Sequence, residues 1–200
     1  MKVYLMGCYG LYEALYGLGL SYGVTSNISF TQFKARPRLH EKMMRRALIQ
    51  APLDGGHNKF LEHIQTWWMI KASRAYWSQF DTYRIGVSKQ SESTMHTIKK
   101  RLLEPGDFHP DTEQSQIDTV NKLIQEKVSV EKIKVNLPEG FLQSREVNIS
   151  FKSLINCYQQ RKNHKLGEWQ EFIRESIRFL PKRYKELLLM YSELEDTINK

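Results

Sequence analysis

The fold is decided by residues 55–96, which read GGHNKFLEHIQTWWMIKASRAYWSQFDTYRIGVSKQSESTMH. This stretch holds three of the four tryptophans and three of the six histidines, followed by a run of Arg, Gln, Ser and Thr. The aromatic residues favour a packed core, because Trp and Tyr bury large apolar areas. The polar run that follows them favours a loop that binds an anion or a nucleotide. The residue types alone leave both interpretations open.

Short motifs follow one another in a fixed order along this stretch. They are Gly56-His57, Leu61-Glu62-His63, Ser73-Arg74-Ala75, Gln79, Thr82-Tyr83-Arg84 and the run from Ser88 to His96. In this order and spacing they resemble the flavin-dependent thymidylate synthases, whose sequences read SGH, LEH, SRxxxxQxxRHR and then xxSxNExSxRY. The match needs one extra residue between Arg84 and Ser88. We therefore expect a divergent, phage-like member of that family.

The C-terminal half of the chain extends the resemblance. Leu137-Pro138-Glu139-Gly140 is similar to the LP-G turn of the family. The family motifs N-x-R-x-L-x-x-F-x-x-x-R and QWEIR are matched in part by Ser150, Lys152, Leu154, Arg161, Trp169 and Arg174. The resemblance covers residues 55–96 and 137–176, and it is lost between 97 and 135.

The resemblance implies an enzyme that binds FAD and deoxyuridine monophosphate (dUMP) at a site shared between subunits of a homotetramer. Such an enzyme is a methyltransferase of nucleotide biosynthesis that acts at C5 of the pyrimidine, with NADPH and methylenetetrahydrofolate as expected co-substrates. The residues that match flavin-binding positions of the family are His57, Thr82, Tyr83, Arg84 and Ser88. The residues that match nucleotide-binding positions of the family are Gln79, Ser91, Ser93, Met95, Lys152 and Arg174. Of these, Ser93 and Arg174 are the expected catalytic residues. Guanidinium groups suit this role, because their forked donors match phosphate oxygens.

Several positions depart from the family pattern. Thr82-Tyr83 replaces an Arg-His pair, and Gln90-Ser91 replaces an Asn-Glu pair. Met95 stands where the family has the loop arginine that reaches the nucleotide phosphate. Ser150 and Lys152 replace the Asn and Arg of N-x-R. We expect weaker phosphate contacts, and hence either a different substrate or a retained fold without catalysis.

Length and composition set the outer limits. Two hundred residues with 40% apolar content fit one domain, here with a charged helical insertion at about residues 97–135. The net charge of +8 favours anionic partners such as nucleotides or nucleic acid. Cys8 and Cys157 form neither a disulfide framework nor a metal signature. The apolar N-terminus is interrupted by Glu13 and is too short to span a bilayer, so we expect a cytoplasmic protein without a membrane segment.

The pattern of apolar residues predicts the order of the elements. We expect strands at 2–8, 66–70 and 146–149, and either a short strand or a loop at 24–30. We expect helices at 9–22, 38–50, 72–83, 150–161 and 183–198, another that begins near Gly167, a helical turn at 57–63 and mostly helix over 97–135. Breaks or turns are expected at 51–56, 106–111 and 137–140, and residues 85–93 read as an ordered loop. The resemblance implies an α+β fold, with a small, mostly antiparallel sheet packed against helices.

The sequence shows no motif that is typical of metal binding or of other kinds of catalysis. His57 and His63 lack the i, i+4 spacing of a helical zinc pair, so no metal site is expected. The sequence contains no P-loop, no GxGxxG and no GxSxG. Three functions stay open: a flavin-dependent enzyme acting on a pyrimidine nucleotide, a non-catalytic nucleic-acid-binding relative, and an enzyme that modifies pyrimidines in DNA.

Overall fold

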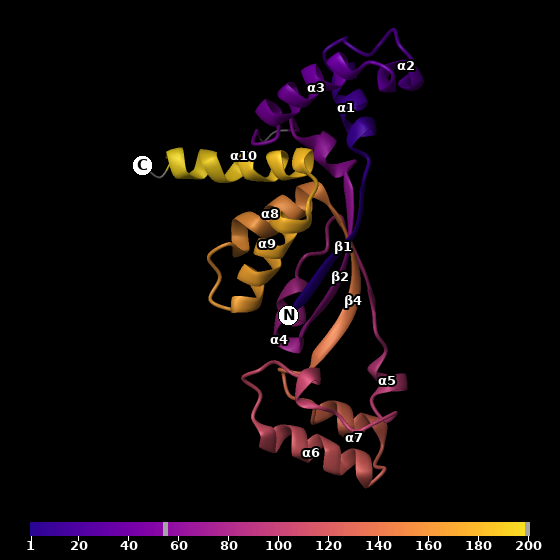
Figure 1. Cartoon of the computed structure of the whole chain (residues 1–200), viewed down its shortest axis with the longest axis vertical. Coiled ribbons are helices and arrows are strands. Elements are labelled where there is room, and N and C mark those ends of the chain that lie inside the picture. Colours follow the sequence, from indigo (N-terminus) through magenta and orange to yellow (C-terminus); the bar gives the residue numbers. More distant parts are fainter. Residues whose placement is uncertain (54–55, 199–200) are drawn as a thin grey trace.

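One twisted antiparallel sheet runs along the molecule and organises everything else (Figure 1). The computed structural model describes residues 1–53 and 56–198, with side chains as far as Met190. The strands lie in the order β1-β2-β4-β3, and they are β1 (Lys2–Tyr9), β2 (Gln65–Ser73), β3 (Val87–Ser91) and β4 (Leu142–Ser150). Each neighbouring pair is antiparallel. The α+β prediction is therefore confirmed.

The strand predictions succeed in the centre of the sheet and fail at one edge. The strands expected at 2–8 and 66–70 form and are slightly longer than expected. The strand expected at 146–149 begins at Leu142, because residues 142–145 continue the ladder with β2, opposite residues 70–73. The loop prediction for residues 85–93 is wrong, since it contains β3. The sequence VSKQS has no alternation of apolar residues, and β3 forms because β4 supplies backbone partners.

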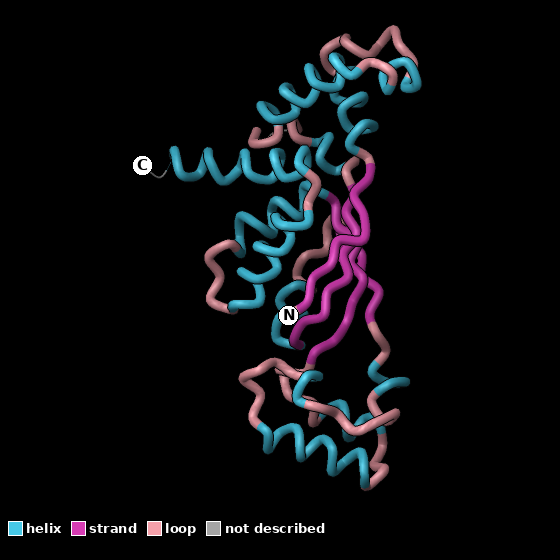
Figure 2. Tube along the Cα trace, viewed as in Figure 1, coloured by secondary structure: helices cyan, strands magenta, loops and turns pink. Residues whose placement is uncertain are grey.

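Helices cover one face of the sheet (Figure 2). The strand side chains on that face are apolar, and three of them, Trp68, Ile70 and Val147, are fully buried. The helices on this side are α4 (Arg74–Phe80), α8 (Phe151–Arg161), α9 (Gly167–Phe179) and α10 (Lys182–Ile198). Trp77, Trp169 and their aromatic neighbours fill the space between the layers. Trp68 and Trp77 of the tryptophan-rich stretch are thus core, whereas Trp67 is half-buried on the other face of the sheet, and the polar continuation of the stretch is not core.

The first end of the molecule consists of α1 (Leu11–Leu20), α2 (Phe30–Lys34), α3 (Pro37–Gln50) and the 3₁₀ turn η1 (Lys59–Glu62). The helix predicted at 38–50 is confirmed, and Pro37 occupies its first turn, where no amide donor is required. The region 24–30 forms turns rather than a strand. The predicted break at 51–56 lies partly outside the described residues, since Asp54 and Gly55 are not described.

The second end has a hydrophobic cluster of its own. The charged region 97–135 is largely helical at α6 (Gln114–Gln125) and α7 (Val130–Val135), next to the short α5 (Thr94–Thr97) and η2 (Pro105–Asp107). Buried apolar residues from these helices and their flanks pack together: Ile98, Leu103, Phe108, Ile117, Val120, Ile124, Ile133, Leu137 and Phe141. The core between sheet and helices is a separate cluster. The long strand β4 leads from one cluster to the other (Figure 1).

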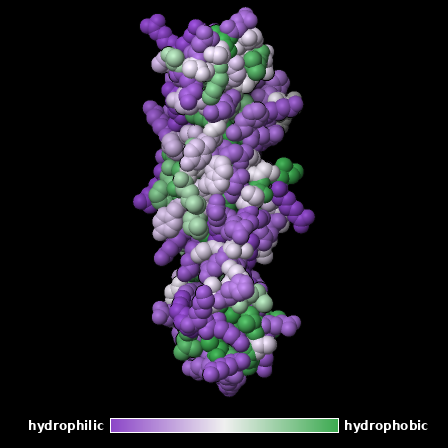
Figure 3. Space-filling view, turned by 90° about the vertical axis from the view of Figure 1, so that its right-hand side faces the viewer, coloured by the Kyte–Doolittle hydropathy of each residue, from purple (hydrophilic) through white to green (hydrophobic). Residues whose placement is uncertain are grey.

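No helix of the described residues lies against the other face of the sheet (Figure 1). Its side chains include Tyr4, Met6 and Met69, which are exposed, and Tyr9, whose ring contacts Trp67 edge-on at 5.5 Å. Figure 3 views this side of the molecule and shows weakly polar and apolar residues in its middle part. Across the described part of the chain, no helix is both long enough and apolar enough to cross a membrane.

Candidate functional site: a cavity beside the start of α8

A cavity of about 1110 Å³ opens where four segments meet. Its walls come from Pro52 and Leu53, from the region 58–65 around η1, from the loop 82–86 and from the first two turns of α8. The volume is at the upper end of what ligand sites in proteins usually enclose. The cavity is therefore large enough for an extended ligand such as a dinucleotide.

The loop 82–86 is fixed in place by Gly86. This glycine has φ of +63°, and its carbonyl accepts a hydrogen bond from the Ser150 amide at 2.7 Å. A Cβ atom on Gly86 would lie 2.5 Å from the Ser150 hydroxyl oxygen, so a larger residue would have to displace that side chain in addition to adopting a left-handed backbone conformation. Ser153 adds a second attachment, because its hydroxyl donates to the Ile85 carbonyl at 2.7 Å. The insertion relative to the family spacing thus falls in a loop that is tied to the N-terminus of α8.

Arg84 supplies the free positive charge of the cavity. Its side chain lines the cavity and is exposed. Within the part of the chain that the structure describes, no carboxylate forms an ion pair with it. An unpaired guanidinium on a cavity wall is suited to bind a phosphate group through two parallel hydrogen bonds.

Lys152 is the second cation of the cavity, but its charge is balanced. It lies in the first turn of α8 and donates to the Glu62 carboxylate of η1 at 2.6 Å. The hydrogen bond from Lys152 lowers the pKa of Glu62, which keeps that carboxylate charged. The family comparison placed Lys152 with the nucleotide, whereas the structure places it in the same cavity as Thr82, Tyr83 and Arg84.

Tyr83 connects the cavity to the core. Its hydroxyl donates to the Gln160 carboxamide oxygen at 2.8 Å and accepts a hydrogen bond from Nε of Arg161 at 3.0 Å. The Arg161 guanidinium also lies 5.0 Å from the centre of the Trp169 ring. Burial raises the pKa of Tyr83, so the phenol stays neutral at ordinary pH. Arg161, which we did not include among the expected site residues, is therefore the cation that positions this phenol.

Neither cysteine is suited to act as a nucleophile. Burial raises the pKa of the Cys157 thiol to about 12 and that of the Cys8 thiol to about 11. The reactive form of cysteine is the thiolate, which is scarce at neutral pH when the pKa is this high. Among the described residues, no group of three His, Cys, Asp or Glu side chains is arranged to hold a metal ion.

A smaller cavity of about 320 Å³ lies between α4, β4 and α7. Arg74 reaches across it and donates to the Leu137 carbonyl at 2.6 Å. Arg145 lies over the Trp77 ring at 4.5 Å and binds both oxygens of Asp81 at 3.0 and 3.1 Å. Its polar lining also includes Ser78, Thr94, Lys134, Glu139 and Gln143. This second cavity adjoins the polar segment that carries the expected nucleotide contacts.

The remaining expected site residues lie outside the lining of the larger cavity. Ser88 and Ser91 lie on the exposed edge strand β3, and Ser93 precedes α5. His57 is exposed just before η1. Gln79 accepts a hydrogen bond from Nε1 of Trp169 at 2.9 Å and so links α4 to α9.

Arg174 is exposed on α9 and pairs with Glu175 at 3.6 Å. It is five residues beyond Trp169, and this spacing puts the two side chains on different sides of the helix. The structure brings together Thr82, Tyr83, Arg84 and Lys152, and does not bring Arg174 to them. The cavity also includes Glu62, Ser153 and Asn156, which the residue patterns did not single out.

Comparison with known protein families shows to which family the chain belongs. The model of the thymidylate synthase complementing protein family matches residues 22–184, and the chain therefore belongs to this family. The resemblance seen in the sequence is confirmed at the level of the family. No protein with curated functional data matches significantly.

Two solved structures share the fold. Both are thymidylate synthase X from Helicobacter pylori in complex with FAD and dUMP, one of them a crystal structure at 2.31 Å resolution. Each superimposes with a TM-score of 0.75 over 94% of this chain, and over 97% and 98% of theirs. The sequence identity is 19% in both cases, so this likeness establishes the fold.

Proposed function

We propose that this protein is a flavin-dependent thymidylate synthase that binds FAD in the larger cavity. The observation that carries the proposal is the Arg84 guanidinium on the wall of a cavity of about 1110 Å³, where no carboxylate of the described residues pairs with it. Membership of the family and the FAD-containing Helicobacter pylori structures support it. The residues fit the group, because a dinucleotide brings two phosphates and Arg84 is free to bind one of them.

The side chains around the cavity have distinct tasks in this proposal. Arg84 binds a phosphate, and Thr82 adds a hydroxyl beside it. Tyr83 presents a neutral phenol whose position is fixed by Arg161 and Gln160. Lys152 and Glu62 close one wall as an ion pair. When bound and reduced, the flavin supplies hydride, and the protein contributes binding, orientation and exclusion of water.

For the substrate we propose dUMP or a related pyrimidine deoxynucleotide, bound at the polar segment around Ser91 and Ser93. Ser91 ends β3 and Ser93 directly precedes α5, and Thr94, the first residue of that helix, lines the smaller cavity. Gln79, Lys152 and Arg174 stay in the proposal as nucleotide contacts, with Arg174 and Ser93 as catalytic residues. Because Arg174 is exposed, its part in the site requires a neighbouring subunit to bring substrate to it.

A homo-oligomer follows from this arrangement, and we propose a homotetramer. The helix-free face of the sheet exposes Tyr4, Met6, Tyr9 and Met69, and such apolar surface commonly marks an interface. Light scattering of the purified protein at micromolar concentration should give a mass well above that of one chain. A monomer under these conditions would contradict a site that is shared between subunits.

Flavin binding can be tested directly. Protein purified or refolded with excess FAD should be yellow, and heating should release FAD into the supernatant. Arg84→Ala removes a charge-assisted hydrogen bond of about 1.5–3 kcal/mol, so FAD affinity should fall roughly tenfold to hundredfold. Lys132→Ala is the control, since Lys132 is an exposed cation on α7 outside both cavities. An absent flavin spectrum with no thermal shift would refute the proposal.

Catalysis needs a separate assay. Tritium release from C5-labelled dUMP should depend on FAD, NADPH and methylenetetrahydrofolate together. Arg174→Ala should abolish release while leaving the flavin spectrum unchanged, whereas Arg84→Ala should affect both. FAD binding without any tritium release would leave a flavoprotein of this fold with a different substrate.

A further inference from the structure

The segment 30–50, at the end of the molecule formed by α1–α3, concentrates positive charge. It contains Lys34, Arg36, Arg38, Lys42, Arg45 and Arg46, against Glu41 as its one acid. Its net charge is thus +5, compared with +8 for the whole chain of 200 residues. A segment of one tenth of the chain therefore carries more than half of the net charge, and it lies outside both cavities described above.

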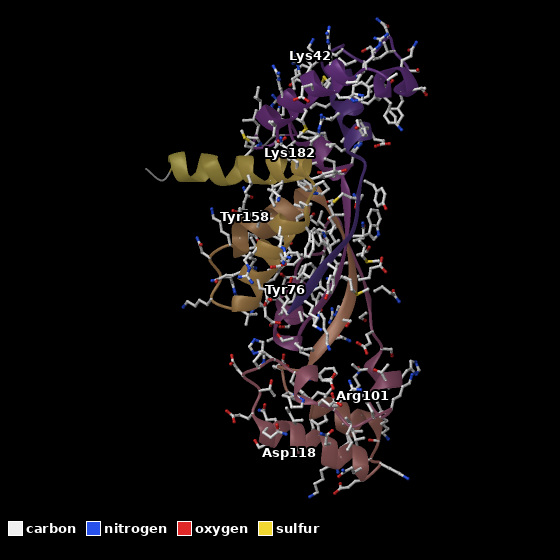
Figure 4. All side chains as sticks on the ribbon, in the orientation of Figure 1. Lys42, Tyr76, Arg101, Asp118, Tyr158 and Lys182 are labelled. Atoms are coloured by element: carbon white, nitrogen blue, oxygen red, sulfur yellow. The ribbon has the colours of Figure 1, made fainter. Side chains whose placement is uncertain are left out.

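Three of these cations form a stripe along α3. Arg38, Lys42 and Arg45 are spaced i, i+4 and i+7, which places them within an arc of about 60° and along about 10 Å of the helix. The three side chains are exposed. The opposite face of α3 carries His40, Met43 and Ala47, which are buried against the rest of this end of the molecule. Figure 4 shows Lys42 on the outer side of α3, away from the sheet.

The stripe has no anionic partner within the described part of the chain. Glu41 is bound by Arg183 of α10 at 3.1 Å, which takes the one acid of the segment away from its neighbours on α3. Lys182 lies beside Arg183 at the start of α10 (Figure 4) and adds a further exposed cation to this end. Like charges at i, i+4 destabilise an isolated helix slightly. The stripe therefore has a small energetic cost in the free protein and would gain from a bound polyanion.

Aromatic rings accompany the cations. The Arg46 guanidinium lies over the Tyr22 ring at 4.1 Å, and Tyr22 is 39% exposed. The Lys34 ammonium lies 5.6 Å from the centre of the Phe30 ring. Unstacked bases bind to surfaces that combine a line of cations with accessible aromatic rings. A peripheral membrane helix would instead expose its apolar face, and the apolar face of α3 is buried.

We infer that α2 and α3 form a binding surface for single-stranded nucleic acid. The phosphates contact Arg38, Lys42 and Arg45, and one base stacks near Tyr22. This activity is independent of the proposed flavin site, because none of these residues lines the larger cavity. Recognition through phosphates and stacking does not depend on base sequence.

The test measures fluorescence anisotropy of a short labelled single strand, of DNA and of RNA, between about 50 and about 200 mM salt. The variant Arg38→Gln/Lys42→Gln/Arg45→Gln is compared with Lys99→Gln/Lys100→Gln/Lys132→Gln, which removes equal charge from exposed positions at the other end. The α3 variant should bind at least about tenfold more weakly, with a salt slope smaller by about 2, since each phosphate contact contributes about 0.7. The control variant should change affinity less than about twofold.

Three outcomes would overturn the inference. One is the absence of binding by the wild type at low salt. Another is an equal loss in both variants, which would indicate unspecific attraction by net charge. The third is tighter binding of duplex DNA or of phosphatidylserine vesicles than of single strands.

Tyr22→Ala should weaken single-strand binding severalfold and leave the salt slope unchanged, because it removes stacking and no phosphate contact. Flavin absorption should be the same in all variants, so failure here is separable from failure of the flavin proposal.

Discussion

Lys152 of α8 and Glu62 of η1 form an ion pair of 2.6 Å across one wall of the larger cavity. The two residues are 90 positions apart in the chain. Among the residues that the structure describes, the cavity therefore contains two cations, and of these only Arg84 has no carboxylate partner. Anion binding in this cavity is therefore restrained by Glu62.

Glu62→Gln should strengthen the binding of FAD. The substitution releases the charge of Lys152 into a cavity that already contains Arg84, and the gain should be up to about fivefold because exposed ion pairs contribute about 0.2–1 kcal/mol. A fluorescence titration with FAD measures the affinity. Glu139→Gln is the matched control, since its pair with Arg74 at 3.7 Å lies outside the larger cavity. Weaker FAD binding by Glu62→Gln would show that Glu62 itself contacts the ligand.

Gly86→Ala should destabilise the protein and displace the loop 82–86. The new Cβ would meet the Ser150 hydroxyl at 2.5 Å, and the residue has φ of +63°. Strain of this kind costs on the order of 1–3 kcal/mol. Gly17→Ala is the contrasting variant, because Gly17 lies inside α1 with open space around it and should gain about 0.5–1 kcal/mol. Urea denaturation measures both, and equal effects would refute this account of Gly86.

Tyr76→Phe should stabilise the protein by about 1 kcal/mol. The Tyr76 hydroxyl is buried and finds no hydrogen-bond partner among the described residues, and such groups cost about 1–3 kcal/mol. Figure 4 shows Tyr76 between the sheet and the helices. Tyr83→Phe is the comparison, since it breaks the bonds to Gln160 and Arg161 and should destabilise by a similar amount. Thermal denaturation of both variants gives the signs, and a loss of stability in Tyr76→Phe would reveal an unseen partner.

Stability should fall between pH 9 and pH 12 in part because of Cys157. Its pKa is 9.0 ordinarily and about 12 in the folded protein, so above pH 9 the unfolded chain loses a proton that the folded one keeps. The stability that this thiol contributes is present below pH 9 and is lost as pH rises. At pH 10 the loss is on the order of 1 kcal/mol. Urea denaturation at pH 7.5 and pH 10 should show a smaller decline for Cys157→Ala than for the wild type.

The cavity left by the smaller side chain lowers the stability of Cys157→Ala at both pH values, so the comparison uses the difference between them. Parallel declines in the two proteins would contradict the role of this thiol. The double variant Cys8→Ala/Cys157→Ala should also keep the tritium-release activity, because neither thiol provides a thiolate at neutral pH.

Met95→Arg should strengthen the binding of dUMP. Met95 is 53% exposed on α5, and the sequence resemblance aligns it with a phosphate-binding arginine of the family. A restored charge-assisted contact is worth about 1.5–3 kcal/mol, or roughly tenfold to hundredfold in affinity. Calorimetric titration with dUMP measures the change, with Met95→Gln as the uncharged control. Unaltered affinity would show that the loop is aligned incorrectly.

The sequence predicted elements well where one face is buried. The pattern around Trp68 identified β2, and the spacing of Leu39, Met43 and Ala47 identified α3, because burial imposes a period on the residues. β3 was missed because both of its faces are polar or half-exposed, and its pairing with β4 depends on residues 54 to 62 positions away. Local patterns carry no information about such a partner.

The candidate site was predictable only in part. Thr82, Tyr83, Arg84 and Lys152 were found through the motifs and do lie together. The pairing of Lys152 with Glu62 was not predictable, because it depends on how η1 packs against α8. The motifs predicted one extra residue between Arg84 and Ser88, but the left-handed conformation of Gly86 in this loop is visible only in the structure.

The two hydrophobic clusters give the two cavities different mechanical properties. The larger cavity is lined by no residue of the second cluster, so bending of the far end leaves its shape intact. The smaller cavity lies at the seam, with Trp77 from one cluster and Leu137 and Phe141 from the other. β4 is the strand that connects the two clusters. Bending of β4 would therefore widen or narrow the smaller cavity. A ligand that contacts both Arg145 and Lys134 in the smaller cavity would connect the two clusters and restrict their motion relative to each other.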